Sequence, residues 1–526
     1  MKDSKKSPPC QEDRLSALPS ELLHQILTFL PDTKSRARTC VLSRRWIGLW
    51  ASHPSIDLRL RYRIDLLAAA RAHVAAVDAA LDAASAATLR RLDVDVWLPS
   101  GPDNHPANAA TVDRWFRAAA DLGVRDLSIQ TKSFPSSSIS ELPCSLFGCR
   151  ELTSLRIKNG VIPEVPSSFD GFHALTTLFF EHVLLSTEIF AAVIAGSPLL
   201  EALHIQGFSG VARLDVSPEN LPNLSSFSMF EPYGEQVKAR IVAPNLTSIH
   251  FDGDLNLLSW NGSPCLVEAT LRNEPYLDFQ SESCWMELVS AVSNAKTLTV
   301  NNLFYQFVIP NKYVNGSHEA MFKNLRKLTC EIDWVTGPLL CSFISNIREC
   351  PLLENLCISF NRVLRLKAKK IMKRSLFFCN KPFHPAELVK AVEEKFEKDE
   401  FDLSEHRWGM GNALDCLKIL EIEHFMGTKN ETLLIEFLLK NAVNLRKFLV
   451  DDFFMRTNEE IHRLFYPIKF DYDNGKEELE QEEDEYDMLG VKLLDPNRKD
   501  VFWPIGFLAA DISSHALWTP AILYLF

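Results

Sequence analysis

The sequence predicts an α/β protein in which a short helical module precedes a curved solenoid of repeats built on a parallel β-sheet. Two patterns in the 526 residues lead to this prediction. Apolar side chains recur at helical spacing over residues 14–55. A different unit, Leu-x-x-Leu-x-Leu with apolar substitutes, then returns along much of the remaining chain.

The repeated unit favours leucine-rich repeats, in which each copy supplies one short strand and neighbouring copies bury each other's leucines. Six successive copies begin at Leu152, Leu175, Leu200, Leu224, Leu246 and Leu266. Their starts are about 20 to 25 residues apart, which is the period of this architecture. Further copies begin at Leu89, Val124, Ala295, Leu325, Leu353, Leu417 and Leu445. With an alanine-rich helical lead-in, they predict a solenoid over residues 56–358 that resumes after a gap.

Four segments fall outside both patterns. Residues 1–13 are polar and expected to be disordered, and residues 466–487 are expected to be an acidic linker. Residues 359–411 form a charged insertion whose basic run suits a solvated face or, alternatively, a local patch for a nucleic acid or an acidic partner. Residues 488–526 form an atypical apolar tail that prolines and an aspartate interrupt, so no membrane contact is expected.

The N-terminal helices carry more apolar surface than two short helices can bury on each other. The first stripe consists of Leu18, Leu22, Leu23, Ile26, Leu27 and Leu30. The second consists of Val41, Leu42, Trp46, Leu49 and Trp50. Either the rest of this chain or another protein must therefore cover them, and the residues alone leave both alternatives open.

Composition and motifs argue against catalysis and against nucleic-acid binding. The net charge of −12 is opposite to that of a general nucleic-acid binder. The 12 cysteines lack zinc-ligand spacing, so reduced thiols are expected, as in a cytoplasmic and/or nuclear protein, with no metal and no cofactor. No Gly-x-Ser-x-Gly, Walker loop or His-Glu-x-x-His occurs. We expect a protein without catalytic residues.

The N-terminal pattern resembles the F-box of plant proteins. The residues that carry the resemblance read LPSELLHQILTFLP and, after a short gap, TCVLSRRWIGLW. Arg36-Ala37 departs from the pattern, since the family often has Ala-Val there. Residues 416–450, CLKILEIEHFMGTKNETLLIEFLLKNAVNLRKFLV, are similar to the FBD domain. With an F-box at 14–55 and an FBD-like region at 412–465, the chain resembles the plant F-box/leucine-rich-repeat/FBD protein family.

This resemblance implies a substrate-recognition subunit of an SCF-type (SKP-cullin-F-box) ubiquitin ligase. The F-box would bind an SKP-family adaptor and through it a cullin, while other subunits perform the ubiquitination chemistry. The implied adaptor-binding residues, shared with the core of the module, are Leu18, Pro19, Leu22, Leu23, Ile26, Leu27, Leu30, Val41, Leu42, Trp46, Leu49 and Trp50. Trp46 and Trp50 are the expected anchors, because aromatic side chains dominate interface energetics. The alternative is a leucine-rich-repeat scaffold that acts without the ligase.

The repeats are expected to hold an unknown target protein on the strand positions that flank the leucines. The candidate target-binding residues are Arg156, Lys158, Thr177, Phe179, His204, Ser248 and His250. Their side chains alternate with the buried leucines and so share one face of the predicted sheet. A solvated strand surface explains the same positions equally well, and no pattern in the sequence identifies a small ligand.

Overall fold

A computed structural model describes residues 15–59, 67–84, 89–99, 105–134, 141–230, 237–273, 282–301, 322–333, 335–347, 350–361, 389–390 and 414–452. The predicted disordered end, the acidic linker and the apolar tail lie outside these residues. So does the charged insertion, apart from its first residues and the pair 389–390.

Within the described residues, 14 strands form one parallel sheet. The strands are β1 (Ser55–Leu58), β2 (Arg91–Pro99), β3 (Asp126–Phe134), β4 (Ser154–Val161), β5 (Thr177–Leu184), β6 (Ala202–Gln206), β8 (Ser226–Phe230), β10 (Ser248–Gly253), β12 (Glu268–Asn273), β13 (Thr297–Asn301), β14 (Lys327–Ile332), β15 (Asn355–Phe360), β16 (Ile419–Phe425) and β17 (Lys447–Asp452). They pair in the order in which the chain makes them. The predicted fold class is confirmed.

The register of the sheet follows the repeated unit. Leu155, Leu178 and Leu203 pair across β4, β5 and β6. The corresponding residue of each predicted copy pairs with that of the next copy in the same register, from Leu92 on β2 to Phe448 on β17. β15 pairs directly with β16, so the insertion between them leaves the sheet continuous. A one-residue slip would expose a whole row of leucines, which is why the apolar pattern sets the register.

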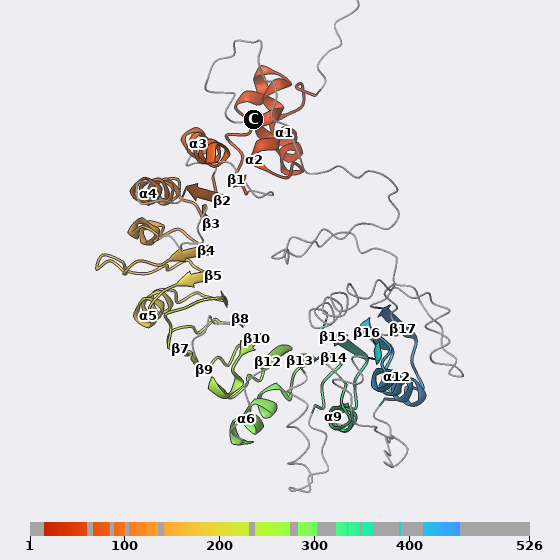
Figure 1. The fold of residues 1–526 in the computed structure, drawn as a ribbon. Coiled ribbons are helices and arrows are strands. Elements are labelled where there is room, and N and C mark those ends of the chain that lie inside the picture. Colours follow the sequence, from red (N-terminus) through yellow and green to blue (C-terminus); the bar gives the residue numbers. More distant parts are fainter. Residues whose placement is uncertain are drawn as a thin grey trace, which may run out of the picture.

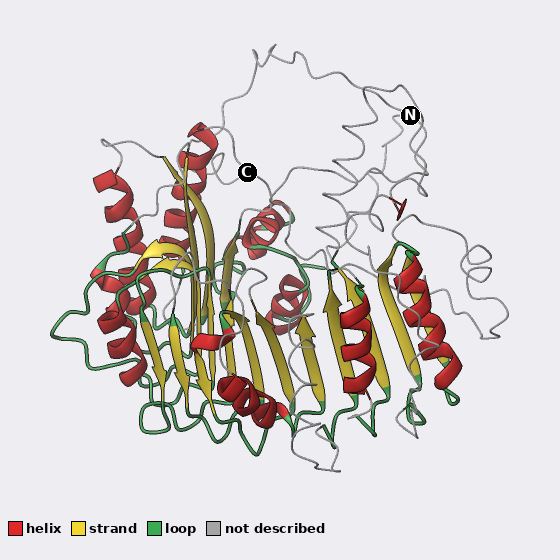
Figure 2. Ribbon diagram, turned by 60° about the horizontal axis from the view of Figure 1, so that its bottom comes forward, coloured by secondary structure: helices red, strands yellow, loops and turns green. Residues whose placement is uncertain are grey.

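Helices cover the outer side of the curved sheet, and the strands line its inner side (Figure 1). These helices are α3 (Leu67–Ala83), α4 (His105–Asp121), α5 (Thr187–Ala195), α6 (Glu282–Val292), α9 (Gly337–Ile347) and α12 (Lys429–Asn441). Figure 2 shows the strands side by side with helices along one face. A helix is wider than a strand, so each repeat that contains both is wider on its helix side than on its strand side. The stack of repeats therefore curves with its strands on the concave side. No described helix is long and apolar enough to cross a bilayer.

A second, smaller sheet was not predicted. β7 (Arg213–Val216), β9 (Lys238–Ile241) and β11 (Leu258–Trp260) pair in parallel, and Figure 1 shows β7 and β9 on the outer side of β8 and β10. Two short 3₁₀ turns, η3 (Cys144–Gly148) and η4 (Leu255–Leu257), complete this outer layer. The repeats that supply these strands are among the shorter ones, and an extended segment returns the chain with fewer residues than a helix.

One hydrophobic core runs through the stack from β1 to β17. Most strands alternate buried and more exposed residues; β8, for example, buries Phe227 and Met229 and exposes part of its other side chains. The buried set faces the outer helices, as the two-residue strand period requires. The remaining set, which includes the candidate target-binding residues, lies on the concave face.

Candidate adaptor-binding and target-binding surfaces

The F-box region folds as four short helical segments. They are α1 (Ser20–Thr28), α2 (Thr33–Arg38), η1 (Thr39–Val41) and η2 (Arg44–Ile47). Leu23, Leu27, Trp46 and Leu49 form a small core of their own, and Leu18, Ile26 and Leu30 pack partly against it. α2 begins at a capped turn, in which the Asp32 carboxylate accepts a hydrogen bond from the Ser35 amide at 2.7 Å.

The two tryptophans lie inside the chain. Trp46 is only 1% exposed, and its indole Nε1 donates a hydrogen bond to the Ser16 hydroxyl at 3.1 Å. Trp50 is half-buried and packs against the core of the repeats. That these tryptophans anchor an adaptor stays a prediction. In this chain they hold the module together and attach it to the solenoid.

The exposed apolar surface of the F-box is made by other side chains. Of the predicted adaptor-binding residues, Pro19, Leu22, Val41 and Leu42 are exposed, and Val41 reaches 82%. Phe29, 79% exposed, and Leu15 are two further exposed apolar side chains of the F-box region. We define the F-box apolar surface as Leu15, Pro19, Leu22, Phe29, Val41 and Leu42.

Phe29 was not among the predicted residues, although it follows Leu22, a member of the first predicted stripe. Leu22 and Phe29 are seven residues apart, so they repeat on one face after two helical turns. This face is offset by one position from the inner pair Leu23 and Leu27. The signal in the sequence was this seven-residue spacing, which marks apolar surface that the small F-box core does not bury.

A buried arginine joins the F-box to the repeats. The Arg36 guanidinium donates to the Leu27 carbonyl at 3.2 Å and to the Ser55 carbonyl at 2.8 Å. It is 7% exposed, and burial lowers its pKa. Beside it, the Thr33 hydroxyl accepts a hydrogen bond from the Asp57 amide at 2.7 Å. The end of α1 is thus tied to β1, the first strand of the sheet, by the residue at which the sequence departs from the F-box pattern.

All seven candidate target-binding residues lie on the concave face. Arg156 and Lys158 come from β4, Thr177 and Phe179 from β5, and His204 from β6. Ser248 and His250 come from β10. Arg156, Phe179 and His204 occupy the same level of adjacent strands, because the parallel register pairs them directly.

Several of these side chains stack into one continuous strip across the strands. The Arg156 guanidinium lies 4.0 Å from the centre of the Phe179 ring, and that ring lies parallel to the His204 ring at 4.0 Å. Phe230 then bridges His204 and His250, with ring centres 5.0 and 3.8 Å away. Arg272 donates to the His250 ring at 3.1 Å. We name this strip the concave ladder: Arg156, Phe179, His204, Phe230, His250 and Arg272.

Phe230 and Arg272 were absent from the predicted set. Both occupy outward positions one step further along their strands, next to Ser228 and Thr270. Because the parallel strands are in register, every second residue of each strand lies on the concave face. This alternation, applied to all strands, predicts Phe230 and Arg272 as well.

The ladder is electrically neutral along its middle. Burial, with the charges of Arg156 and Lys158 adding to it, lowers the pKa of His204 to about 4. Burial and the charge of Arg272 lower the pKa of His250 to about 3. Both rings are therefore uncharged near pH 7.

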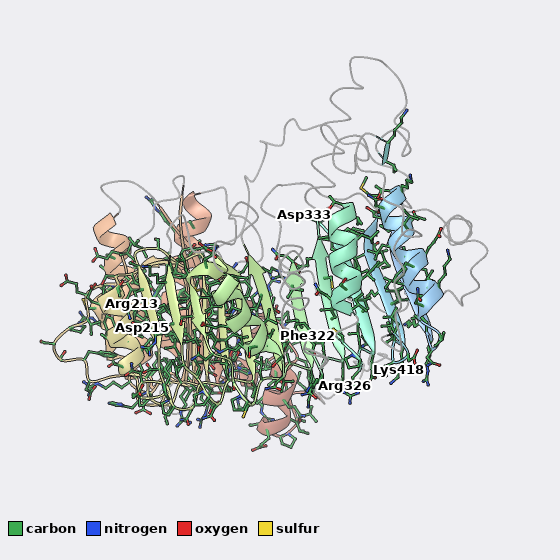
Figure 3. All side chains as sticks on the ribbon, turned by 90° about the horizontal axis from the view of Figure 1, so that it is seen from below. Arg213, Asp215, Phe322, Arg326, Asp333 and Lys418 are labelled. Carbon is green, nitrogen blue, oxygen red and sulfur yellow. The ribbon has the colours of Figure 1, made fainter. Side chains whose placement is uncertain are left out.

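The charges beside the ladder are largely paired. Lys158 and Glu181 lie 3.0 Å apart, and Arg272 pairs with Glu331. Further along the sheet, just before β14 and β16, Arg326 and Lys418 lie close together in Figure 3, and both pair with Glu354. Arg156 differs from these cations: among the described residues, no carboxylate forms an ion pair with it.

The side chains described above suit binding contacts rather than chemical reaction. Burial raises the pKa of Cys149 to about 12 and also raises that of Cys357, so both thiols stay protonated. Among the described residues, no group of three or more His, Cys, Asp or Glu side chains could hold a metal ion. The two surfaces can bind partners through apolar, stacking and charge contacts.

Comparison with known proteins defines the class. Models of three domains match the chain: the F-box domain over residues 15–57, the leucine-rich repeats of FBD-associated F-box protein At5g56370 over 112–262, and FBD over 414–450. The chain therefore carries an F-box, leucine-rich repeats and an FBD domain, the content of plant FBD-associated F-box/leucine-rich-repeat proteins. F-box domains generally bind SKP-family adaptors.

Individual relatives come from Arabidopsis thaliana. The chain is 25% identical to FBD-associated F-box protein At5g56560, over 87% of this chain and 96% of the relative. It is 30% identical to FBD-associated F-box protein At5g56370, over 42% of this chain and 47% of the relative. It is 24% identical to F-box/LRR-repeat protein At5g02910, over 56% of this chain and 61% of the relative. The resemblance seen in the sequence is confirmed.

Proposed function

We propose that this chain is the substrate-recognition subunit of an SCF-type ubiquitin ligase. Its F-box binds an SKP-family adaptor and through it a cullin, and its repeats hold a target protein for ubiquitination by other subunits. The chain contributes binding and position, while the chemistry belongs to its partners. The observation that carries this proposal is the F-box apolar surface.

This surface is exceptional within the chain. Among the described residues, 11 large apolar side chains are exposed, and five of them lie between Leu15 and Leu42. The small F-box core beneath them is already closed by Leu23, Leu27, Trp46 and Leu49. An exposed apolar cluster over a closed core serves no folding purpose in the chain, and such clusters mark protein-binding sites.

The joint at Arg36 supports the same function. An adaptor bound to the F-box and a target bound to the repeats keep a constant relation only if the two parts move together. Hydrogen bonds from Arg36 to both α1 and β1, and the packing of Trp50 on the repeat core, provide this connection. A receptor of this kind needs rigidity because ubiquitin transfer depends on where the target is held.

The proposal is tested by co-purification of the full chain with a plant SKP-family adaptor. The double variant Leu22→Asp/Phe29→Asp places charges in the interface, where an unpaired buried charge is costly. We expect binding to fall by about a hundredfold or more, since two such charges together cost roughly 3 kcal/mol or more. Because both side chains are exposed, the melting temperature should stay that of the wild type.

Val443→Asp is the matched control. Val443 is 74% exposed and lies just after α12, in the FBD region. This variant should bind the adaptor like the wild type. Failure of the wild-type chain to bind any SKP-family adaptor, while a known F-box protein binds in the same assay, would leave the ligase-independent scaffold as the better explanation.

A further inference from the structure

The concave ladder presents ring edges rather than ring faces to a ligand. Phe179 and His204 stack with an angle of 4° between their planes, so each covers one face of the other. The Arg156 guanidinium lies over the Phe179 ring as well. The edges of such rings carry partial positive charge, and they pack well against the face of another aromatic ring or against an oxygen.

The β4 end of the ladder offers a cation to a ligand. Arg156 is exposed, and among the described residues no carboxylate pairs with it. Its contact with Phe179 fixes the guanidinium plane, while the N–H groups at the rim of that plane keep the forked geometry that matches a carboxylate. At the other end, Arg272 is held by Glu331 and lies 3.9 Å from Asp252. A ligand that complements the charge of the ladder therefore carries an anionic group at the β4 end, next to Arg156.

The length of the ladder suits a peptide. It crosses β4, β5, β6, β8, β10 and β12, and neighbouring strands lie about 4.8 Å apart, so it extends for roughly 24 Å. An extended chain advances by about 3.3 Å per residue, so about seven residues span this distance. A single small aromatic acid would cover only part of it.

A row of hydroxyl groups runs beside the ladder. Ser154, Thr177, Ser226 and Ser248 occupy the outward positions next to the ladder on β4, β5, β8 and β10, each half-buried, and Ala202 takes this position on β6. Hydroxyl groups donate and accept hydrogen bonds, so such a row can satisfy the amides and carbonyls of an extended backbone.

We propose that the concave ladder binds an extended peptide segment of the target protein, about seven residues long, that carries an aromatic side chain and a carboxylate. The aromatic face lies on the ring edges of Phe179, His204 and Phe230, and the carboxylate pairs with Arg156. This proposal rests on the proposed function, since it names the chemistry of the target that the receptor holds.

The test is a selection from a displayed library of random seven-residue peptides on the immobilised full-length chain. The wild type should enrich peptides that combine a Phe, Tyr or Trp with an Asp or Glu. Arg156→Gln should lose the acidic preference and bind the selected peptides about tenfold more weakly, since one charge-assisted pair is removed. Phe179→Leu, which keeps apolar volume but removes the ring, should lose the aromatic preference.

Arg213→Gln is the matched control. Arg213 is an exposed arginine on β7 that pairs with Asp215 at 2.7 Å, and both are labelled in Figure 3. This variant should select the same peptides as the wild type. The proposal is overturned if the wild type enriches no aromatic–acidic pair, or if Arg156→Gln and Phe179→Leu select the same sequences as the wild type.

A competition assay distinguishes the peptide from a small ligand. Free phenylacetate carries the same two groups, and it should displace a selected peptide only at a concentration about a hundredfold higher, because it lacks the backbone contacts. If phenylacetate displaced the selected peptide at the same concentration as the peptide itself, the peptide proposal would be overturned, and a small aromatic acid would be the better ligand. Adaptor binding is measured separately on the same proteins, so a failure of peptide selection is distinguishable from a failure of the F-box to bind.

Discussion

His204 illustrates how the alignment of neighbouring strands determines the protonation state and the ring contacts of a single residue. In the sequence it is one histidine between two buried residues of a repeat. In the structure it lies parallel to Phe179 and near Phe230. Burial, and with it the positive charges of Arg156 and Lys158, disfavours its protonation. Its pKa of about 4 makes it an uncharged member of an aromatic strip.

This pKa makes the stability of the chain depend on pH. An unfolded histidine binds a proton near pH 6.5, but folded His204 does so only near pH 4. Between these values the unfolded state binds more protons, so stability falls as the pH drops from about 6.5 to about 4. The variant His204→Phe keeps an aromatic ring without the proton. Its melting temperature relative to the wild type should therefore rise steadily over this range.

The control for this measurement is His173→Phe, which replaces an exposed histidine in the loop before β5. Its melting temperature relative to the wild type should not follow the same course. A constant difference between His204→Phe and the wild type from pH 7.5 to pH 4 would contradict the assigned pKa.

At the scale of elements, α12 shows how a helix start can secure a whole repeat. The Thr428 hydroxyl accepts a hydrogen bond from the Glu431 amide, and the Glu431 carboxylate accepts from the amides of Met426 and Gly427 at 3.0 and 2.9 Å. This arrangement extends the capping box, because the wholly buried Glu431 reaches the amides of the two residues that precede the cap residue Thr428. Next to it, the Asn430 side chain donates to the Val335 carbonyl of an earlier repeat at 2.9 Å.

Removal of the Glu431 carboxylate should destabilise this part of the solenoid. Glu431→Ala leaves two amides without a partner, at a cost of about 1–3 kcal/mol for each one that stays buried. Glu431→Gln keeps an acceptor oxygen at the same place, as a capping box allows, and should recover most of the loss. Urea unfolding of the three proteins measures the difference. Equal loss in both variants would show that the charge, rather than the hydrogen bonds, matters.

At the scale of the molecule, the continuous sheet makes the proposed adaptor-binding surface and the proposed target-binding surface parts of one body. β1 follows the F-box directly and pairs with β2, so the module is attached to the first strand rather than to a linker. The rest of the sheet continues in sequence order to β17. Under the proposed function, the position of a bound target relative to the adaptor depends on the joint at Arg36.

The variant Arg36→Met should loosen this joint. It retains the apolar stem but removes the donors to the Leu27 and Ser55 carbonyls, leaving these groups short of partners at a cost of about 1–3 kcal/mol. Amide hydrogen exchange over α1 and β1 should accelerate by about tenfold or more, while exchange over β5 to β17 stays unchanged. Arg38→Met, which changes an exposed arginine on the same helix, is the control. Unchanged exchange in Arg36→Met would show that packing alone holds the joint.

Much of this architecture was predictable because it follows from local patterns. The leucine positions identify the strands and their common register, since burial of alternate residues admits one alignment. The second sheet of β7, β9 and β11 was not predicted, because its three short strands become a sheet only when neighbouring repeats stack. The role of Arg36 was hidden for the same reason: its acceptors are distant along the chain.

The sequence by itself determined the repeat architecture, the F-box and FBD resemblances and the face of the sheet open to a target, because spacing along the chain dictates which side chains share a face. Only the tertiary structure decided which apolar residues of the F-box are buried and which are exposed, and that Arg156, Phe179, His204, Phe230, His250 and Arg272 form the concave ladder. These outcomes depend on contacts between segments that the chain separates, and such contacts exist only after the strands have stacked.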